Sequence, residues 1–246
     1  MADRILAIET STLSCSVALF ESGQCVHAEQ RAEEKHVHAS SLLPMIDAGM
    51  SALGWTPKSL DAVAVCAGPG SYTGLRIGTS TAKGICHAHR IPLIAINSLE
   101  IQAYRLAESE ALNPGARVIA VMDARRDEVY TQTFQWNGTQ FEAIDGTRAL
   151  VIDTAASAED LFPAAGAHAI VVGDAAHKTE RLTADMGVEW RFVQAFPTAA
   201  DARIPAGVAY AEERFEDVAY FTPAYLKDFQ AGKPKDPLGL RKSTPA

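Results

Sequence analysis

The feature of this sequence that most restricts its fold is an order of elements that occurs twice. Three strand-like segments, a helix, a strand and a second helix are predicted from Ile5–Ile8 onward to about residue 89, and one more strand and helix follow to about residue 108. The same order restarts at Val118–Met122 and extends to residue 186, with a hairpin predicted at Asn137-Gly138. The repeat lies in element order and not in residue identity. It predicts an α/β protein with two similar lobes that meet at a cleft.

The boundary between these lobes is expected near residues 97–116, where Pro114-Gly115 supplies a turn. We therefore expect a first lobe over residues 1–100 and a second lobe over 101–230. Residues 231–246 contain basic residues and prolines and are expected to form a flexible tail.

Charge and hydropathy exclude several classes of protein. The 246 residues include 22 Lys and Arg against 30 Asp and Glu, and the net charge of -8 disfavours the counterion release that drives nucleic-acid binding. We therefore expect contact with RNA only through a partner. No apolar run approaches the ~20 residues that cross a bilayer, so a cytoplasmic protein without membrane association is expected. The four cysteines are widely spaced and predict neither a zinc site nor a redox motif.

In each predicted lobe, the first strand ends on an acid. Glu9 precedes Thr10-Ser11-Thr12, and Asp123 precedes Ala124-Arg125-Arg126. In a cleft, such turns offer hydroxyls and backbone N–H groups to phosphate, and the acid can hold a metal ion through water. The alternative is ordinary turn chemistry, in which Ser, Thr and Asp side chains bond to nearby backbone. The sequence leaves both interpretations open.

A glycine-rich segment over residues 68–78 joins a buried strand to a helix, where exposed N–H groups attract anions. It fits neither standard phosphate motif, because Gly74 is followed by Leu75 and Arg76, and Thr73 stands where the dinucleotide pattern has glycine. A tight turn that uses glycine for its backbone angles is the alternative. The candidate nucleotide or phosphate site comprises Glu9, Ser11, Thr12, Gly68, Gly70, Ser71, Gly74, Arg76 and Asp123.

Two segments, residues 5–12 and 67–78, closely resemble the TsaB (YeaZ) family. Shorter matches to the same family lie at residues 82–84, 91–93, 123–130 and 223–227, so that the resemblance spans nearly the whole chain. Residues 137–220 are the least distinctive. The resemblance implies the actin-like, sugar-kinase-like (ASKHA) fold with two duplicated α/β lobes and mixed sheets.

The resemblance also implies a function. Proteins of this family act beside the catalytic paralogue TsaD and the ATPase TsaE in transfer of a threonylcarbamoyl group to N6 of adenosine 37 in tRNAs that read ANN codons. This chain would be the scaffold and activator, paired with TsaD or, when alone, with a second copy. No cofactor is expected within the chain; ATP or ADP with magnesium would lie at an interface of the complex, and the phosphate-site candidates would be vestigial.

One departure from TsaD bears on catalysis. TsaD carries Asn-His-x-x-x-His, whose histidines bind a metal ion, just after the segment that matches Ile91-Pro92-Leu93. Here Ser98 and Gln102 occupy the two ligand positions, and neither side chain can replace an imidazole. We therefore expect no metal site and no catalytic residue in this chain.

A partner surface is predicted on two helices. The first carries the apolar stripe Leu42, Leu43, Ile46, Met50 and Leu53. Such a stripe ordinarily covers a sheet, but adjacent apolar residues make this one wide enough to contact something outside as well. The resemblance implies that this helix and the helix containing Ala82, Ile85 and His89 form a helical bundle with TsaD or with a second copy.

Two other functions compete with this interpretation. An independent ATP-dependent phosphotransferase of the sugar-kinase type would use Glu9 and Asp123 around a magnesium nucleotide, but the nearest candidate for an adenosine-binding segment is Val172-Gly173-Asp174-Ala175. A glycoprotease-like metallopeptidase would need Asn-His-x-x-x-His or His-Glu-x-x-His, and the sequence has neither.

Overall fold

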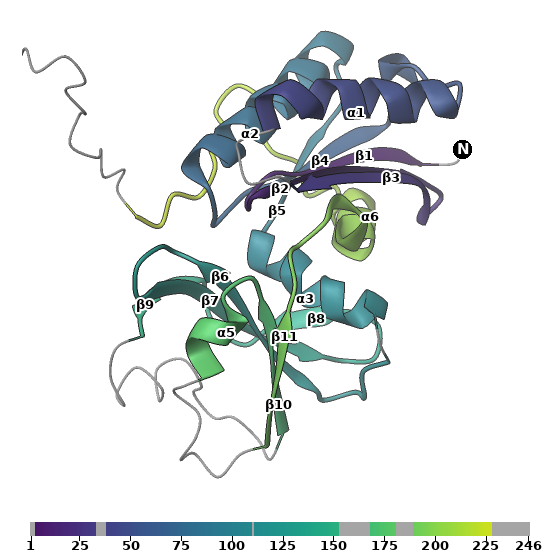
Figure 1. Cartoon of the computed structure of the whole chain (residues 1–246). Coiled ribbons are helices and arrows are strands. Elements are labelled where there is room, and N and C mark those ends of the chain that lie inside the picture. Colours follow the sequence, from purple (N-terminus) through teal and green to yellow (C-terminus); the bar gives the residue numbers. More distant parts are fainter. Residues whose placement is uncertain (1–2, 33–37, 110, 153–167, 181–188, 228–246) are drawn as a thin grey trace, which may run out of the picture.

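The computed structural model describes residues 3–32, 38–109, 111–152, 168–180 and 189–227. These residues form two α/β lobes, which lie one above the other in Figure 1. Within these ranges, every helix falls short of the length and apolarity that a bilayer-spanning segment needs.

The first lobe contains a five-stranded sheet with strand order β3-β2-β1-β4-β5. Its strands are β1 (Arg4–Glu9), β2 (Ser14–Glu21), β3 (Gln24–Ala32), β4 (Ala62–Cys66) and β5 (Leu93–Ile96). β1, β2 and β3 pair antiparallel, whereas β1, β4 and β5 pair parallel. β4 is buried at every position, as expected for a parallel strand covered on both faces.

The second lobe repeats this topology. Its strands are β6 (Arg117–Asp123), β7 (Glu128–Trp136), β8 (Phe141–Ala143), β9 (Arg148–Val151), β10 (His168–Gly173) and β11 (Glu189–Gln194). The order is β11-β10-β6-β7-β8, with β9 also paired to β7. β6 therefore takes the place of β1, between an antiparallel partner and a parallel one. The predicted duplication and the actin-like, sugar-kinase-like fold class are confirmed; β9 and β11 were not predicted.

The helices pack on both sheets. They are α1 (His38–Ala52), α2 (Tyr72–His89), α3 (Ser98–Ser109), α5 (Ala176–Thr179) and α6 (Arg203–Ala211), with the short 3-10 helices η1 (Pro57–Ser59) and η3 (Ala199–Ala202). α1 and α2 cover the outer face of the first sheet, and α6 lies on the face toward the second lobe (Figure 1). α3 carries the chain from one lobe to the other.

After β11 the chain returns to the first lobe. The alanines of η3 and α6, Ala199, Ala202, Ala206 and Ala209, belong to the first lobe's hydrophobic core. Backbone hydrogen bonds then join Glu216 N to Leu93 O and Ala224 N to Ala67 O. Residues 199–224, which fall in the predicted second lobe, thus form a layer of the first.

Three sequence predictions reach beyond the described part of the chain. The predicted helix at 156–162 and the tail at 231–246 lie outside it, and of the helix predicted over 177–186 only the start, α5, lies inside. The lobe boundary at residue 100 stays a prediction.

Candidate functional site

The β1–β2 turn, which the sequence offers as a phosphate site, is sealed inside the first lobe. Glu9, Ser11 and Thr12 are only 0%, 2% and 6% exposed. Glu9 Oε1 accepts a hydrogen bond from Ser11 N at 2.6 Å, whereas Glu9 Oε2 and the Ser11 hydroxyl have no hydrogen-bond partner within the described chain. Thr10 N donates to Cys66 Sγ at 3.2 Å. These side chains therefore cannot contact a phosphate unless the turn opens.

Burial also changes the ionisation of Glu9. Burial raises the pKa of Glu9 from 4.5 to about 7; the hydrogen bond from Ser11 N opposes the rise, and the nearby Asp201 carboxylate adds to it. Near neutral pH, a large fraction of Glu9 is thus protonated.

The glycine loop closes over this turn through direct backbone contact. At Gly70, Gly74 and Gly78, an added Cβ would lie within 3.0 Å of an atom of Thr10 or Ser11. Gly70 also has a φ of 154°, which side-chain-bearing residues rarely adopt. The close packing of the loop on the β1–β2 turn therefore explains why these positions are glycine.

The start of α2 is capped by the loop itself. Ser71 N donates to Ser11 O at 2.6 Å, and the Ser71 hydroxyl accepts from Gly74 N at 3.3 Å. Arg76 lies on the exposed side of the helix, where it donates to the Tyr72 hydroxyl at 3.1 Å. Gly68, with a φ of 98°, lies against the carbonyl of Ala224. This arrangement favours the tight-turn interpretation for residues 68–78.

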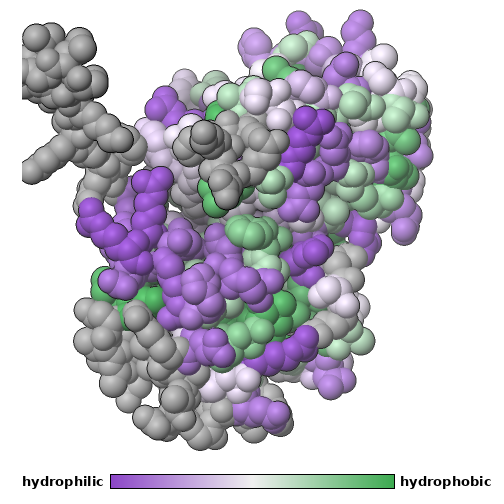
Figure 2. Space-filling model, viewed as in Figure 1, coloured by the Kyte–Doolittle hydropathy of each residue, from purple (hydrophilic) through white to green (hydrophobic). Residues whose placement is uncertain are grey.

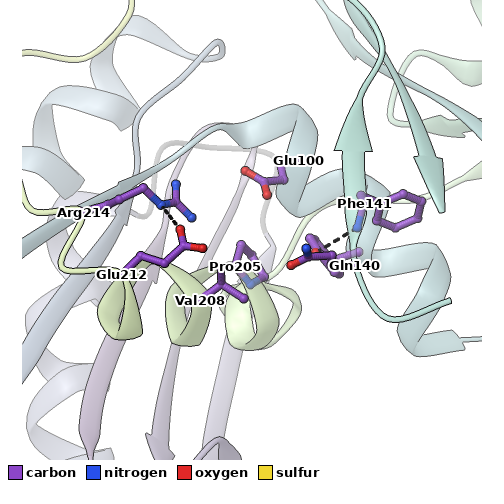
Figure 3. Close-up of a pocket in the computed structure, with 8 residues that line it drawn as sticks. Glu100, Gln140, Phe141, Pro205, Val208, Glu212 and Arg214 are labelled. Carbon is purple, nitrogen blue, oxygen red and sulfur yellow. Dashed lines mark hydrogen bonds and ion pairs between the residues drawn. The ribbon is translucent and has the colours of Figure 1, made fainter. Parts of the chain in front are cut away.

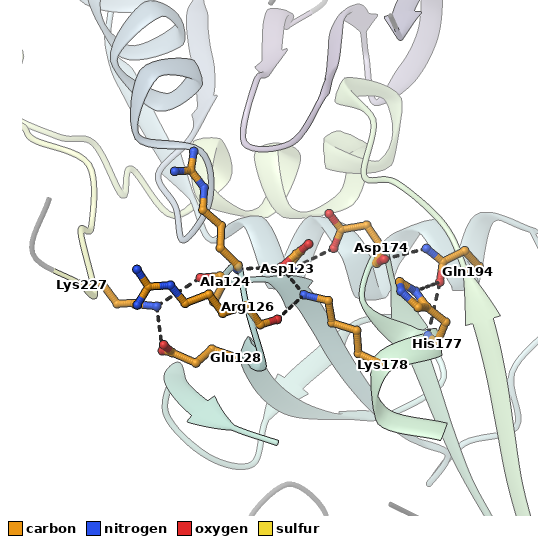
Figure 4. Close-up of polar contacts among 10 residues, drawn as sticks. Asp123, Ala124, Arg126, Glu128, Asp174, His177, Lys178, Gln194 and Lys227 are labelled. Atoms are coloured by element: carbon orange, nitrogen blue, oxygen red, sulfur yellow. Dashed lines mark hydrogen bonds and ion pairs between the residues drawn. The ribbon is translucent and has the colours of Figure 1, made fainter. Parts of the chain in front are cut away.

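The matching acid of the second lobe has the opposite environment. Asp123 is exposed, and its Oδ1 accepts from Lys178 Nζ at 2.6 Å. Asp123 N donates to Asp174 Oδ1 at 2.9 Å, and burial raises the pKa of Asp174 to about 6. Figure 4 shows these groups beside the β6–β7 turn. Among the described residues, no group of three or more His, Cys, Asp or Glu side chains is arranged to hold a metal ion.

Ser98 and Gln102 lie in the first turns of α3. Both residues are fully buried. Ser98 N donates to Gly68 O at 3.0 Å, while the Ser98 hydroxyl and both polar atoms of the Gln102 amide have no hydrogen-bond partner in the described part of the chain. The two residues predicted to replace metal ligands are thus uncharged and buried.

The predicted partner stripe is divided between the core and the surface. Four of its members are buried in the first lobe's own core, because α1 and α2 pack on the sheet: Leu42, Ile46, Met50 and Ala82. These four side chains contribute to the core of this chain, and their assignment to a partner interface stays a prediction. Leu43 is 59% exposed, and Leu53, Ile85 and His89 are partly exposed.

Two hollows were not anticipated from the sequence. A shallow one of about 500 Å³ lies between the first turns of α1 and α2 and is lined by Ala39, Tyr72, Thr73, Arg76, Ile77, Ser80 and Thr81. A smaller one of about 200 Å³ lies among α3, α6 and the β7–β8 hairpin (Figure 3). In the latter, burial raises the pKa of Glu100, and Arg214 opposes the rise. Neither has a sequence signature, since the residues that line each hollow come from elements that are separate in the sequence.

The two duplicated lobes define an actin-like, sugar-kinase-like protein, and comparisons with known proteins narrow this class. The family model described as TsaD, tRNA N6-adenosine threonylcarbamoyltransferase, matches residues 28–235. The "tRNA threonylcarbamoyladenosine biosynthesis protein TsaB" of Haemophilus influenzae is 38% identical over 126 residues, which are 51% of this chain and 51% of that protein. The protein of the same name from Escherichia coli is 36% identical over 148 residues, 57% of this chain and 62% of that one.

A solved structure gives wider coverage. YeaZ from Pseudomonas aeruginosa superposes with a TM-score of 0.79 and 28% identity, covering 91% of this chain and 100% of that one. The chain therefore belongs to the threonylcarbamoyltransferase family and, within it, to the TsaB (YeaZ) group. The alignments span between 51% and 62% of the length of the two curated relatives.

Proposed function

We propose that this chain is a non-catalytic accessory subunit in the synthesis of N6-threonylcarbamoyladenosine at adenosine 37 of tRNAs that read ANN codons. It acts as scaffold and activator by pairing with a TsaD-like catalytic paralogue, joined by a TsaE-like ATPase. The names of the curated relatives, tRNA threonylcarbamoyladenosine biosynthesis proteins, support the pathway.

The observation that carries the proposal is the pair Ser98 and Gln102 at the start of α3. Both are fully buried and uncharged. A hydroxyl and a carboxamide are weak ligands for the transition metals that imidazole binds, so a metal-dependent transfer needs residues from another protein. Pairing with a paralogue of the same fold supplies them.

The outer face of α1 and α2 is the surface we assign to that paralogue and, in its absence, to a second copy. Leu43 projects from it with 59% of its surface exposed. The 500 Å³ hollow beside Tyr72 and Ile77 lies between the same two helices and can receive side chains of a partner helix.

A nucleotide with magnesium, on this proposal, lies at the interface with the partner. Glu9, Ser11 and Thr12 are too deeply buried to hold its phosphates, so the partner's residues would provide most of the contacts. The same burial argues against an independent phosphotransferase built on Glu9.

The test is reconstitution of the modification from purified components. The assay combines this chain with a TsaD-like protein, a TsaE-like ATPase, a threonylcarbamoyl-adenylate synthase and an unmodified tRNA. Modification is expected only when this chain is present, and the chain alone is expected to be inactive. Equal modification in its absence would overturn the proposal.

The substitution Leu43→Glu tests the assigned partner surface. Because Leu43 is exposed, the substitution is expected to leave the free energy of unfolding nearly unchanged while weakening pairing with the TsaD-like partner about tenfold or more. Ile144→Glu, at a residue of the second lobe that is 48% exposed, is the matched control. Co-elution in size-exclusion chromatography measures pairing, and unchanged co-elution of the Leu43 variant would place the interface elsewhere.

A further inference from the structure

The β6–β7 turn of the second lobe has a strained backbone. Arg125 and Arg126 have φ values of 70° and 55°. Two successive non-glycine residues in the left-handed region cost about 1–2 kcal/mol each. Such a conformation persists only where the surroundings hold it.

Three segments distant in sequence provide that support. Lys178 Nζ donates to Arg126 O at 3.0 Å, and Lys227 Nζ donates to Ala124 O at 3.1 Å. The two lysines approach the turn from opposite sides (Figure 4). Ile152 N also donates to Asp127 O at 2.7 Å. The turn is therefore braced on its backbone, which fixes the direction in which each side chain leaves the chain.

The same lysines neutralise the acids that flank the turn. Lys178 pairs with Asp123 at 2.6 Å, and Lys227 pairs with Glu128 at 2.7 Å. The guanidinium groups of Arg125 and Arg126 are exposed and form no hydrogen bond or ion pair within the part of the chain that the structure describes. Figure 2 shows hydrophilic side chains gathered on this face near the junction of the lobes. Two free guanidiniums are thus left beside two paired acids, Asp123 and Glu128, and a third acid of the turn, Asp127.

We propose that this turn is an RNA-contact site, at which Arg125 and Arg126 each bind a backbone phosphate of the tRNA. The planar guanidinium presents paired N–H donors that match phosphate oxygens. The inference rests on the proposed function, which makes tRNA the substrate of the complex. It revises the expectation that RNA touches this chain only indirectly.

An RNA backbone fits the turn better than a free nucleotide does. Small ligands are bound in hollows that bury most of their surface. The turn lines neither of the two hollows described above, and both arginines are exposed. A polymer, by contrast, gains affinity from separate phosphate contacts along its length. With a net charge of -8, this chain adds a few such contacts to those of its partner.

The test measures tRNA binding by the full chain in complex with its TsaD-like partner. Fluorescence anisotropy with a labelled, unmodified tRNA is recorded across a series of salt concentrations. In the double variant Arg125→Gly/Arg126→Gly, glycine adopts the same positive φ without strain, so the turn is kept while the guanidiniums are lost. We expect affinity at low salt to fall about tenfold, and the log–log salt slope to decrease in magnitude by about 1.5, because each phosphate contact contributes about 0.7–0.9.

Arg90→Gly is the matched control. Arg90 is also exposed, lies at a φ of 55° at the end of α2, and forms no side-chain hydrogen bond or ion pair in the described part of the chain. Its removal is expected to leave the salt slope unchanged. Co-elution with the partner is verified for every variant, so that a loss of pairing is not mistaken for a loss of RNA contact.

Each result separates the hypotheses. Equal affinity and slope for the double variant and the wild type overturn the proposal. If the double variant loses ADP binding but keeps its affinity for tRNA, the proposal is also overturned. The arginines would then bind a nucleotide. Because binding is measured without modification, failure of the reconstituted reaction would count against the proposed function alone.

Discussion

The β1–β2 turn and the β6–β7 turn occupy the same place in the two lobes, yet they differ in almost every physical property. Each follows the central strand of its sheet and begins with an acid, Glu9 or Asp123. Glu9 is fully buried under the glycine loop, whereas Asp123 is exposed and paired with Lys178. The first turn is held by backbone packing, the second by lysine side chains.

This contrast shows that the same turn can be buried in one lobe of a duplicated fold and exposed in the other. In the first lobe, Gly70 and Gly74 allow a loop to pack directly on the turn, where Glu9 and Ser11 are buried. In the second lobe, Lys178 and Lys227 hold the turn from its sides and leave its tip open. Equivalent topology therefore fixes where a turn lies but not whether solvent reaches it.

The largest effect is expected where the glycine loop packs on the first turn. Gly74→Ala would force a Cβ against the carbonyl of Thr10, and we expect a loss of about 4 kcal/mol in the free energy of unfolding. Gly84→Ala, in the same helix with open space around the added Cβ, should instead stabilise by about 0.5–1 kcal/mol. Urea denaturation measures both, and similar values for the two variants would show that the loop does not pack as described.

A second prediction concerns the buried acid and pH. Because the pKa of Glu9 is raised from 4.5 to about 7, the folded protein keeps a proton that the unfolded chain releases. Its contribution to stability is fully present below pH 4.5 and is lost as pH rises through about 7, a change of roughly 3 kcal/mol. Glu9→Gln should remove this dependence. The free energy of unfolding of the variant should therefore increase relative to that of the wild type as pH rises. A stability difference that is constant from pH 4 to pH 8 would show that folding does not raise the pKa of Glu9.

The smallest effect is expected from loosening the second turn. Lys227→Met removes the hydrogen bond to Ala124 O and the ion pair with Glu128, both partly buried, at a cost of about 1 kcal/mol. Arg31→Met, which breaks the exposed pair with Glu29, is the control and should change stability by less than about 0.5 kcal/mol. Equal losses in thermal unfolding would mean that Lys227 does not brace the turn.

The fold was predictable because its central strands carry strong local signals. β4 is an apolar run buried at all positions, and the Asn137-Gly138 hairpin forms between β7 and β8 as predicted. β11 escaped prediction, since its residues are only exposed or half-buried and give no apolar run. α6 was not predicted either, because Pro205 and Gly207 interrupt its helical pattern and its buried residues are mostly small alanines.

The site was less predictable, since its properties depend on contacts between distant segments. The sequence located both acids at strand ends, but burial of Glu9 depends on Gly70 and Gly74, some sixty residues later. In the partner stripe, Leu42 and Leu43 are neighbours of equal hydropathy, yet only Leu43 is exposed. Which of them faces the sheet is decided by the rotation of α1 on β2, and that rotation is not readable from hydropathy alone.

The layer formed by η3 and α6 has a consequence for how the chain is made. β1 to β5 are synthesised first, but Ala199, Ala206 and Ala209, which cover one face of their sheet, are synthesised after the whole second lobe. At about 5–20 residues per second, the roughly 100 residues between β5 and η3 take about 5–20 s to translate. During that time the nascent first sheet has an uncovered apolar face, open to chaperones or to other nascent chains. The lobe that leaves the ribosome first is therefore the last to be completed.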